Sequence, residues 1–281
     1  MHAIFTKCRT AQHIFQQEVW KLKRYLRQFW LPGVFALLAL AVYLFGSPSP
    51  PQVDKYENYV AADTLAGKRV LPVYGVSRTD SKIALTIDAA WGADKTPEIL
   101  RILEEKGIKA TFFLVGRWVR EFPEETKAIV KAGHLIGSHS DSHAHFCQLS
   151  NEQIEKEVKA AEDAIVSAGA PKPTLFRPPF GEYDDRVVQK LRDLGYQVIQ
   201  WTIDTLDWKE GRTTGQVLEV VFRKAAPGAI ILCHNNAASI AEYLPALIDE
   251  LKARGYEFAT VDELLYSGFN IDNNGIQHPE S

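Results

Sequence analysis

Five residues that could take part in catalysis or metal binding each stand at or near the end of a short apolar run. Asp88 ends IALTID (83–88), His139 lies late in LIGSHS (135–140), and His234 ends AIILCH (229–234). Arg177 lies late in TLFRPP (174–179), and Asp204 ends QVIQWTID (197–204). Parallel β/α enzymes carry their chemistry at the carboxyl ends of their strands. Strands that merely run into polar loops would explain one or two such residues, so we interpret the five together as an active site.

The segment HSDSH offers a pair of metal ligands. His139 and His143 are four residues apart, and imidazoles at this spacing can meet one metal ion if the loop coils into a helical turn. Two surface histidines without a ligand are the alternative that the spacing alone leaves open. The neighbouring segments favour the metal site.

Two further segments have compositions that suit a site. In RPPFG (177–181) two prolines stiffen the chain after Arg177 and would hold its side chain in place. A rigid loop with a structural ion pair is the alternative. In DTLDW (204–208) two acids precede Trp208, although a tryptophan is more often part of a core than the wall of a substrate pocket.

Alternating strands and helices must position these residues. Two more apolar runs, ATFFLVG (110–116) and EFATV (257–261), bring the strand-like runs to seven, and amphipathic helical patterns lie between them. Glycines stand shortly before the following strands, where a left-handed helix C-cap favours a residue without Cβ: Gly107, Gly133, Gly169, Gly195, Gly228 and Gly255. The pattern predicts a parallel β/α architecture, which a barrel and an open doubly wound sheet both satisfy. Seven units in about 200 residues favour the barrel. No glycine-rich phosphate-binding signature follows a run, so we expect no nucleotide.

The N-terminal residues predict where the protein resides. Residues 1–30 hold six Lys/Arg and one acid and sum to +5, whereas the remaining chain sums to −8, giving the net charge of −3. Residues 29–46 contain no charge and are just long enough to span a bilayer. We therefore expect a basic cytoplasmic arm (1–28), a single transmembrane anchor (29–46) and a linker (47–79), with the catalytic domain outside the cytoplasm at the cell membrane. A cleaved signal peptide, which would make the protein secreted, is the alternative.

Overall composition excludes several other classes of protein. Hydrophobic residues make up 46% and charged residues 24% of the 281, as in ordinary globular proteins. Three cysteines are too few for a disulfide-stapled scaffold. The negative charge argues against nucleic-acid binding. Residues 270–281 carry no recognisable motif, and we expect a flexible tail there.

Taken in order, the segments at the strand ends resemble the motifs of the NodB-homology polysaccharide deacetylases, carbohydrate esterase family four. The family's T-F-D-D, H-x-x-x-H, R-x-P-Y, D-x-x-x-W and L-x-H motifs stand here as TIDA (86–89), HSDSH (139–143), RPPF (177–180), DTLDW (204–208) and LCH (232–234). The resemblance places a deacetylase domain at residues 80–269 and implies a distorted (β/α) barrel. The basic arm, the anchor and the phrase LPVYGVSRTDSKIALTIDAAWG are most similar to the sporulation-associated PdaB-type subgroup.

The resemblance implies hydrolysis of N-acetyl groups on peptidoglycan or a related cell-wall glycan. Asp88 would then be the general base and His234 the general acid. Asp204 would hydrogen-bond the imidazole of His234 and favour its charged form, and Arg177 would keep Asp88 ionised. The remaining matched positions would face the substrate: the backbone N–H of Phe180 in the oxyanion site, and Trp208 and Leu232 around the acetyl group.

The metal site departs from the family pattern. The resemblance makes His139 and His143 ligands of a divalent ion, zinc or else cobalt, but the family's third ligand, an aspartate, is Ala89 here. Two histidines bind zinc more weakly than two histidines with a carboxylate. Water could complete the site, or Asp94 or Asp141 could replace the missing ligand.

Three functions therefore stay open on the sequence. The first is a membrane-anchored, metal-assisted N-deacetylase with a possible role in sporulation. The second is a catalytically weak or inactive glycan-binding or morphogenetic protein on the same scaffold, which the alanine at position 89 motivates. The third is an O-acetyl esterase, because the same residues could serve when only the leaving group changes.

Overall fold

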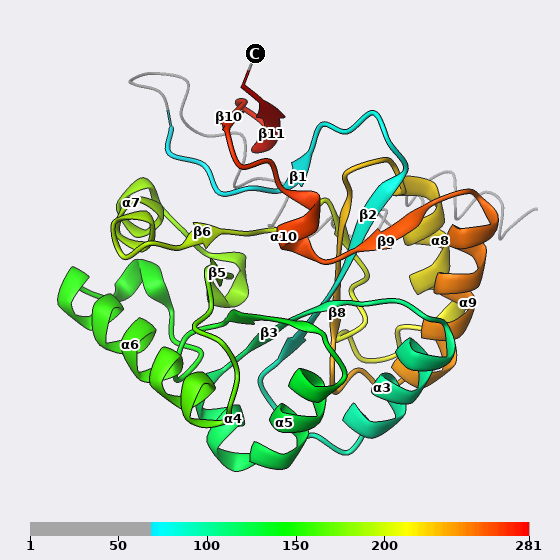
Figure 1. Cartoon of the computed structure of the whole chain (residues 1–281), viewed down its shortest axis with the longest axis horizontal. Coiled ribbons are helices and arrows are strands. Elements are labelled where there is room, and N and C mark those ends of the chain that lie inside the picture. The colour runs from blue at the N-terminus through cyan, green and yellow to red at the C-terminus, as the bar shows by residue number, and fades with distance from the viewer. Residues whose placement is uncertain (1–68, 281) are drawn as a thin grey trace, which may run out of the picture. The chain divides into compact units, whose positions relative to one another are not determined.

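The fold is built around a parallel sheet with helices packed along its outer face (Figure 1). The computed structural model describes residues 69–280. In this part of the chain the strands follow one another in the order β6–β5–β4–β3–β2–β8–β7, and β9 pairs with the start of β2. The strands are β2 (Lys82–Ala89), β3 (Thr111–Leu114), β4 (Leu135–Ser138), β5 (Leu175–Phe176), β6 (Gln197–Val198), β7 (Ile203–Asp204), β8 (Ile230–His234) and β9 (Glu257–Ala259). Every pairing between them is parallel. Each of the seven apolar runs contains at least one of these strands, as predicted.

Helices connect the strands and cover them. They are α3 (Thr96–Glu105), α4 (Gly116–Glu121), α5 (Pro123–Lys131), α6 (Asn151–Ser167), α7 (Asp185–Asp193), α8 (Thr214–Lys224), α9 (Ile240–Ala253) and α10 (Val261–Leu264), with short 3₁₀ turns at Phe146–Gln148 and Pro179–Gly181. The start of α6 shows how the sequence specifies a boundary. The Ser150 hydroxyl accepts the Gln153 backbone N–H, and the Gln153 side chain accepts the Ser150 N–H, so two otherwise unpaired donors are satisfied.

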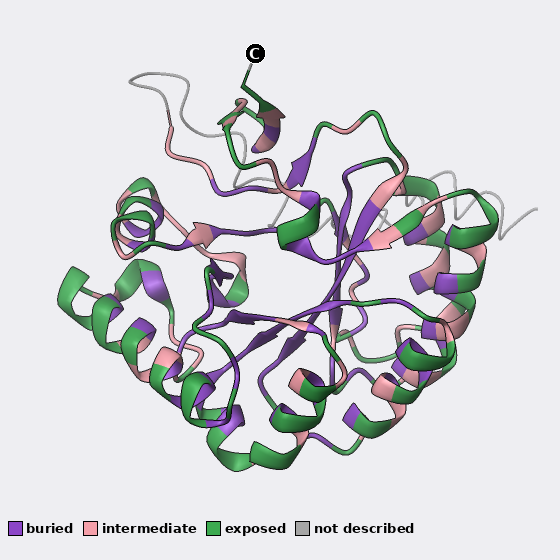
Figure 2. Ribbon diagram, in the orientation of Figure 1, coloured by how far each residue is buried: buried purple, intermediate pink, exposed green. Residues whose placement is uncertain are grey.

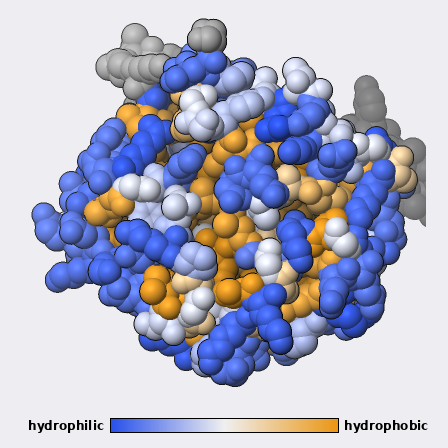
Figure 3. All heavy atoms as spheres, viewed as in Figure 1, coloured by the Kyte–Doolittle hydropathy of each residue, from blue (hydrophilic) through white to orange (hydrophobic). Residues whose placement is uncertain are grey.

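Strand β2 shows which side chains face the helices and which face the interior. Ile83, Leu85, Ile87 and Ala89 belong to the large core cluster under the helices, whereas Ala84 packs in a second cluster within the curved sheet. Successive side chains of a strand point to opposite faces, so Thr86 and Asp88 share the inner face with Ala84. Figure 2 shows the strands as the buried centre and the helices exposed along their outer sides. Figure 3 shows hydrophilic side chains on the peripheral helices and hydrophobic residues toward the middle of this face.

The run QVIQWTID forms two short strands rather than one, because its two ends pair with different neighbours. β6 pairs with β5, and β7 pairs with β8. Between them the Gln200 N–H donates to the carbonyl of Val73, and Val73 donates back to the carbonyl of Val198. Residue 75 in turn bridges to Ala229. Residues 73–75, which precede β2, thus fill the gap between the edge strands β6 and β7. This arrangement fits a distorted barrel that is closed in part by the chain before β2.

Strand pairing extends beyond the predicted domain boundaries at residues 80 and 269. Strand β1 (Gly75–Val76), expected in the linker, pairs with β11 (Ile276–Pro279), and β11 pairs with β10 (Phe269–Ile271). Residues 270–280, predicted as a flexible tail, contain most of this hairpin, which uses β1 as its third strand. Gly228 explains part of the tight packing here: its φ is +80°, and a Cβ on it would lie 1.6 Å from the carbonyl oxygen of Val76.

The predicted arm (1–28), the anchor (29–46) and most of the linker lie outside the described residues. Among residues 69–280, no helix combines the length and the apolar character that crossing a bilayer requires.

Candidate active site

The predicted reactive residues meet at the carboxyl ends of the strands. Asp88 and His234 are direct register partners on the neighbouring strands β2 and β8. The backbone N–H of His139 donates to the carbonyl of Leu114, at the end of β3, and that of Arg177 donates to Ser138, at the end of β4. Four strands far apart in the sequence therefore bring these side chains to one edge, as the sequence predicts.

Arg177 is fully buried and holds Asp88 in a fixed orientation. Its Nη1 donates to Asp88 Oδ1 at 2.6 Å and to the hydroxyl of Thr86 at 2.9 Å, and its Nη2 donates to the carbonyl of Gln200 at 3.1 Å. The guanidinium also stacks over the Phe113 ring, 4.1 Å from its centroid. Burial by itself would raise the pKa of Asp88, but the charge of Arg177, the largest opposing cause, outweighs it and the pKa lies below its usual value. Asp88 is therefore an ionised, oriented carboxylate.

The geometry around His139 defines its tautomer. Its Nδ1 lies 2.7 Å from the carbonyl oxygen of Arg177, which can only accept, so Nδ1 carries the proton. Nε2 then presents a lone pair to Asp88 Oδ2, 3.5 Å away. Burial lowers the pKa of His139, so the pair is a neutral imidazole facing a carboxylate. Two acceptor atoms that face each other in this way suit a cation.

His143 is brought beside His139 by a left-handed turn rather than by the helical turn that the spacing suggested. Ser140 and His143 have φ values of +67° and +61°, and the Ser140 hydroxyl accepts the backbone N–H of His143. The two imidazole centroids lie 4.9 Å apart. Burial, and then the neighbouring His139, lower the pKa of His143 to about 3. Its buried Nδ1 has no hydrogen-bond partner, so His143 too is a neutral imidazole with a free nitrogen.

Backbone strain is concentrated around this edge. The non-glycine residues with positive φ in the described chain are Ser140, His143, Phe180 and Leu206. All of them lie in loops that follow β4, β5 or β7. Strained backbone of this kind persists where the surrounding structure holds it, and it clusters at functional sites.

The two histidines fit a metal ion, but a third ligand does not join them. Their free nitrogens are donors that a divalent ion accepts, yet no set of three His, Cys, Asp or Glu side chains within residues 69–280 is arranged to hold one. Ala89 is fully buried in the cluster beneath the helices. Asp94 is exposed, and both carboxylate oxygens of Asp141 accept from Arg120, at 2.7 and 2.9 Å. Neither substitute that the sequence suggested is placed as a ligand.

The hydrogen-bond partner of His234 is Asp207 and not Asp204 as expected. His234 Nδ1 lies 2.7 Å from Asp207 Oδ1, and its backbone N–H donates to Oδ2 at 3.0 Å. The hydroxyl of Tyr243, on α9, also donates to Oδ2. Burial would lower the pKa of His234, but the hydrogen bond and charge of Asp207 outweigh it and raise the pKa. The protonated imidazole is thereby favoured.

Asp204 has a different task. Its Oδ1 accepts the backbone N–H of Leu206 at 2.8 Å, within the tight turn that contains the positive φ of Leu206. Burial raises the pKa of Asp204. The segment DTLDW contains two acids, and their spacing along the chain does not determine which of them reaches His234.

The residues predicted to face the substrate lie around the same edge. Phe180 has φ +60° and is 38% exposed, and its backbone N–H donates to no acceptor among the described residues. Leu232 is buried two residues before His234 on the same face of β8. Trp208 is 51% exposed, in the loop after β7.

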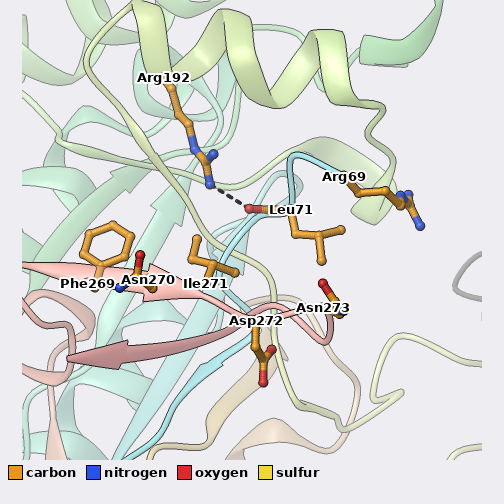
Figure 4. A pocket seen from close by; sticks show the side chains of 8 residues that line it. All are labelled: Arg69, Leu71, Arg192, Phe269, Asn270, Ile271, Asp272 and Asn273. Atoms are coloured by element: carbon orange, nitrogen blue, oxygen red, sulfur yellow. Dashed lines mark hydrogen bonds between the residues drawn. The ribbon is translucent and has the colours of Figure 1, made fainter. Parts of the chain in front are cut away.

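A separate cavity lies away from this edge. Arg69, Leu71, Arg192 and residues 269–273 line it, and Arg192 donates to the carbonyl of Leu71 at 2.7 Å (Figure 4). None of the predicted site residues contributes to its wall, so we do not assign it to the active site.

Comparisons with known proteins agree with this geometry. Residues 75–199 match the family model described as polysaccharide deacetylase. The chain is 32% identical over 231 residues to the peptidoglycan-N-acetylglucosamine deacetylase PgdA of Listeria monocytogenes, covering 81% of this chain and 49% of that protein. It is 30% identical over 190 residues to the peptidoglycan-N-acetylmuramic acid deacetylase PdaA of Bacillus subtilis, covering 66% and 72%. The chain thus belongs to the polysaccharide deacetylase family, and it spans about half the length of the Listeria relative.

A solved structure of a family member raises the question of activity. The chain superposes with a TM-score of 0.67 and 37% identity on a carbohydrate esterase family 4 pseudoenzyme of Bacillus anthracis, covering 75% of this chain and 73% of that one. A mutant of that pseudoenzyme is described as having restored enzymatic activity.

Proposed function

We propose that this chain is a membrane-anchored, extracytoplasmic N-deacetylase that hydrolyses acetamido groups of peptidoglycan or a related cell-wall glycan. One observation carries the proposal. An ionised carboxylate held by Arg177 stands beside an imidazole held by Asp207, on neighbouring strands. A scaffold that only bound glycan would not need a base and an acid that are each fixed by a buried partner.

The residues divide the reaction between them. Asp88, ionised at neutral pH, accepts a proton from the attacking water. His234, held protonated by Asp207, donates a proton to the departing amine as the C–N bond breaks. The free backbone N–H of Phe180 donates to the oxygen that becomes negatively charged. Acetate and a free amino sugar are the products.

A divalent metal, zinc or cobalt, would be held by His139 and His143, whose neutral imidazoles have nitrogens available for it. When bound, it would polarise the amide carbonyl and lower the pKa of a bound water. With two histidines and no carboxylate, we expect the ion to be held weakly.

The location is also part of the proposal. The +5 charge of residues 1–30 and the uncharged segment 29–46 support a single-pass anchor with its N-terminus inside. Relatives are named for both amino sugars of peptidoglycan, which supports that polymer as the substrate class. The anchor and the phrase LPVYGVSRTDSKIALTIDAAWG support a place in the PdaB-type subgroup and a role in sporulation.

The test is acetate release by the full-length protein, purified in detergent, from N-acetylated peptidoglycan with added Zn²⁺ or Co²⁺. We expect release that His234→Gln abolishes. A folded wild-type protein that releases no acetate from any N-acetylated glycan would refute the proposal. Glycan binding without release would support a binding protein, and release from acetate esters alone would support the esterase.

A further inference from the structure

Exposed aromatic rings gather at the same edge as the reactive residues. The large hydrophobic side chains that stand out into solvent within residues 69–280 are Trp91 at 50%, Trp208 at 51%, Val166 at 47% and Phe180 at 38% exposed. Single exposed apolar residues are ordinary on protein surfaces. Here, however, the three aromatic ones all lie in loops that follow strands β2, β5 and β7, and only Val166 lies elsewhere, on α6.

The loop that carries Trp91 is held by hydrogen bonds even though the Trp91 side chain is exposed. The carbonyl of the next residue, Gly92, accepts the indole N–H of Trp118 at 2.6 Å and the side-chain amide of Asn235 at 2.7 Å. Asn235 in turn donates its backbone N–H to the carbonyl of Asp88 at 3.0 Å. Asn235, the residue after His234, therefore links this loop to the strand that carries Asp88.

Trp91 also contacts His143, the more exposed of the two predicted metal ligands. Its ring lies 4.8 Å from that of His143, at an interplanar angle of 63°. His143 also meets the ring of Phe180, with centroids 4.4 Å apart. One part of the indole is thus packed against the site, while half of its surface faces solvent.

We propose that Trp91 forms a sugar-binding subsite, which takes the apolar C–H face of a pyranose ring in an N-acetylated amino-sugar glycan. This inference rests on the proposed function and adds a residue that determines how the substrate is held. A pyranose presents hydroxyls at its rim and C–H groups on its faces, and an aromatic side chain offers a large apolar surface with few rotatable bonds. Because the loop is already fixed, little conformational freedom is lost when the sugar stacks on the ring.

Binding can be measured apart from catalysis. The full-length protein would carry His234→Gln to prevent turnover, and would be kept in a detergent without a sugar headgroup. Titration with chitopentaose in a calorimeter then gives Kd for this parent and for Trp91→Ala, Trp91→Phe and Val166→Ala. We expect Trp91→Ala to weaken binding about tenfold, which corresponds to about 1.4 kcal/mol. Trp91→Phe should stay within about threefold of the parent, and Val166→Ala, the matched exposed control, should not change Kd.

The alternative outcomes separate the possible failures. Equal Kd values for the parent and Trp91→Ala would overturn the subsite, as would a parent that does not bind chitopentaose at all. A loss of Zn²⁺ affinity in Trp91→Ala with unchanged chitopentaose affinity would also overturn it, since Trp91 would then only position His143. If wild-type protein bound the glycan through Trp91 but released no acetate, the subsite would stand and the proposed deacetylase function would fail.

Discussion

Replacing Asp207 by asparagine removes the carboxylate charge that is hydrogen-bonded to His234 and contributes most to its protonated form. In the folded protein the carboxylate accepts three donors: His234 Nδ1 at 2.7 Å, the His234 backbone N–H at 3.0 Å, and the Tyr243 hydroxyl. Asparagine has one oxygen and one NH₂ group, so its NH₂ must face at least one of these donors. If the NH₂ faces Nδ1, the imidazole is driven to the neutral tautomer with its lone pair on Nδ1 and its proton on Nε2, which is a much weaker acid than the imidazolium.

The size of the effect follows from these contacts. A hydrogen bond to a charged group contributes about 1.5–3 kcal/mol, and a misplaced proton on a general acid costs about 10²–10⁴-fold in rate. We expect kcat for acetate release to fall about 100-fold or more in Asp207→Asn, with KM changed by less than about threefold. Leaving a buried donor unpaired should also lower the free energy of unfolding by about 1–3 kcal/mol.

The pH profile supplies an independent readout. Wild-type activity needs His234 protonated and should be lost as the pH rises through its raised pKa, above the usual 6.5. Without the charge of Asp207 that pKa falls, so the alkaline loss of activity should begin at a lower pH. Initial rates measured from pH 5 to 9 would show this shift.

Asp204→Asn is the matched control, because its side-chain oxygen can still accept the Leu206 N–H. We expect activity within about threefold of wild type. The reasoning would be refuted if Asp204→Asn lost as much activity as we predict for Asp207→Asn, while Asp207→Asn kept wild-type rates and pH dependence.

Three further changes test other parts of the structure. Ala89 is the last residue of β2 and is fully buried in the helix-facing cluster, so the carboxylate of Ala89→Asp has to turn toward the histidines to bind a metal. We expect a lower melting temperature without metal and a larger rise on adding Zn²⁺ than in wild type or Ala89→Asn, and an equal rise in all three would mean that residue 89 does not reach the histidines. His134 accepts the Ala110 N–H and burial lowers its pKa to about 4, so between pH 6.5 and 4 the unfolded chain binds a proton that the folded one does not, and stability falls as the pH falls. His134→Asn keeps the acceptor and cannot titrate, so urea unfolding at pH 7 and 4.5 should show a loss smaller by about 2 kcal/mol; an unchanged loss would contradict this assignment. Gly137→Ala puts a Cβ 2.5 Å from the ring of Phe113 and should destabilise the protein by about 1–3 kcal/mol in urea unfolding; a wild-type midpoint would show that the ring moves freely.

Several features of the fold could be predicted because they depend on local sequence. The seven apolar runs form strands, and the predicted glycines 107, 133, 169, 195, 228 and 255 all have positive φ. A run of buried side chains and a left-handed C-cap each impose their requirement on residues next to one another. The parallel order of the strands then brought Asp88, His139, Arg177 and His234 to one edge, as expected.

The ends of the domain could not be predicted in this way. Strands β1, β10 and β11 have no strong pattern of their own, and they form because β1 finds β11 about 200 residues later in the chain, where β11 also pairs with β10. The run 197–204 is equally dependent on its surroundings, since it divides where its partner changes from β5 to β8.

The sequence by itself thus determined the strand and helix alternation, the edge at which the chemistry lies, and the identity of most residues there. Only the tertiary structure decided which acid is hydrogen-bonded to His234. Asp204 and Asp207 are three residues apart and chemically alike, but the turn at Leu206 directs Asp204 to its own backbone and leaves Asp207 under the imidazole, where Tyr243 from α9 completes its hydrogen bonds. A hydrogen bond forms only when donor and acceptor are placed to within a few tenths of an ångström, and the groups concerned here are far apart in the chain. Spacing along the sequence does not contain that information.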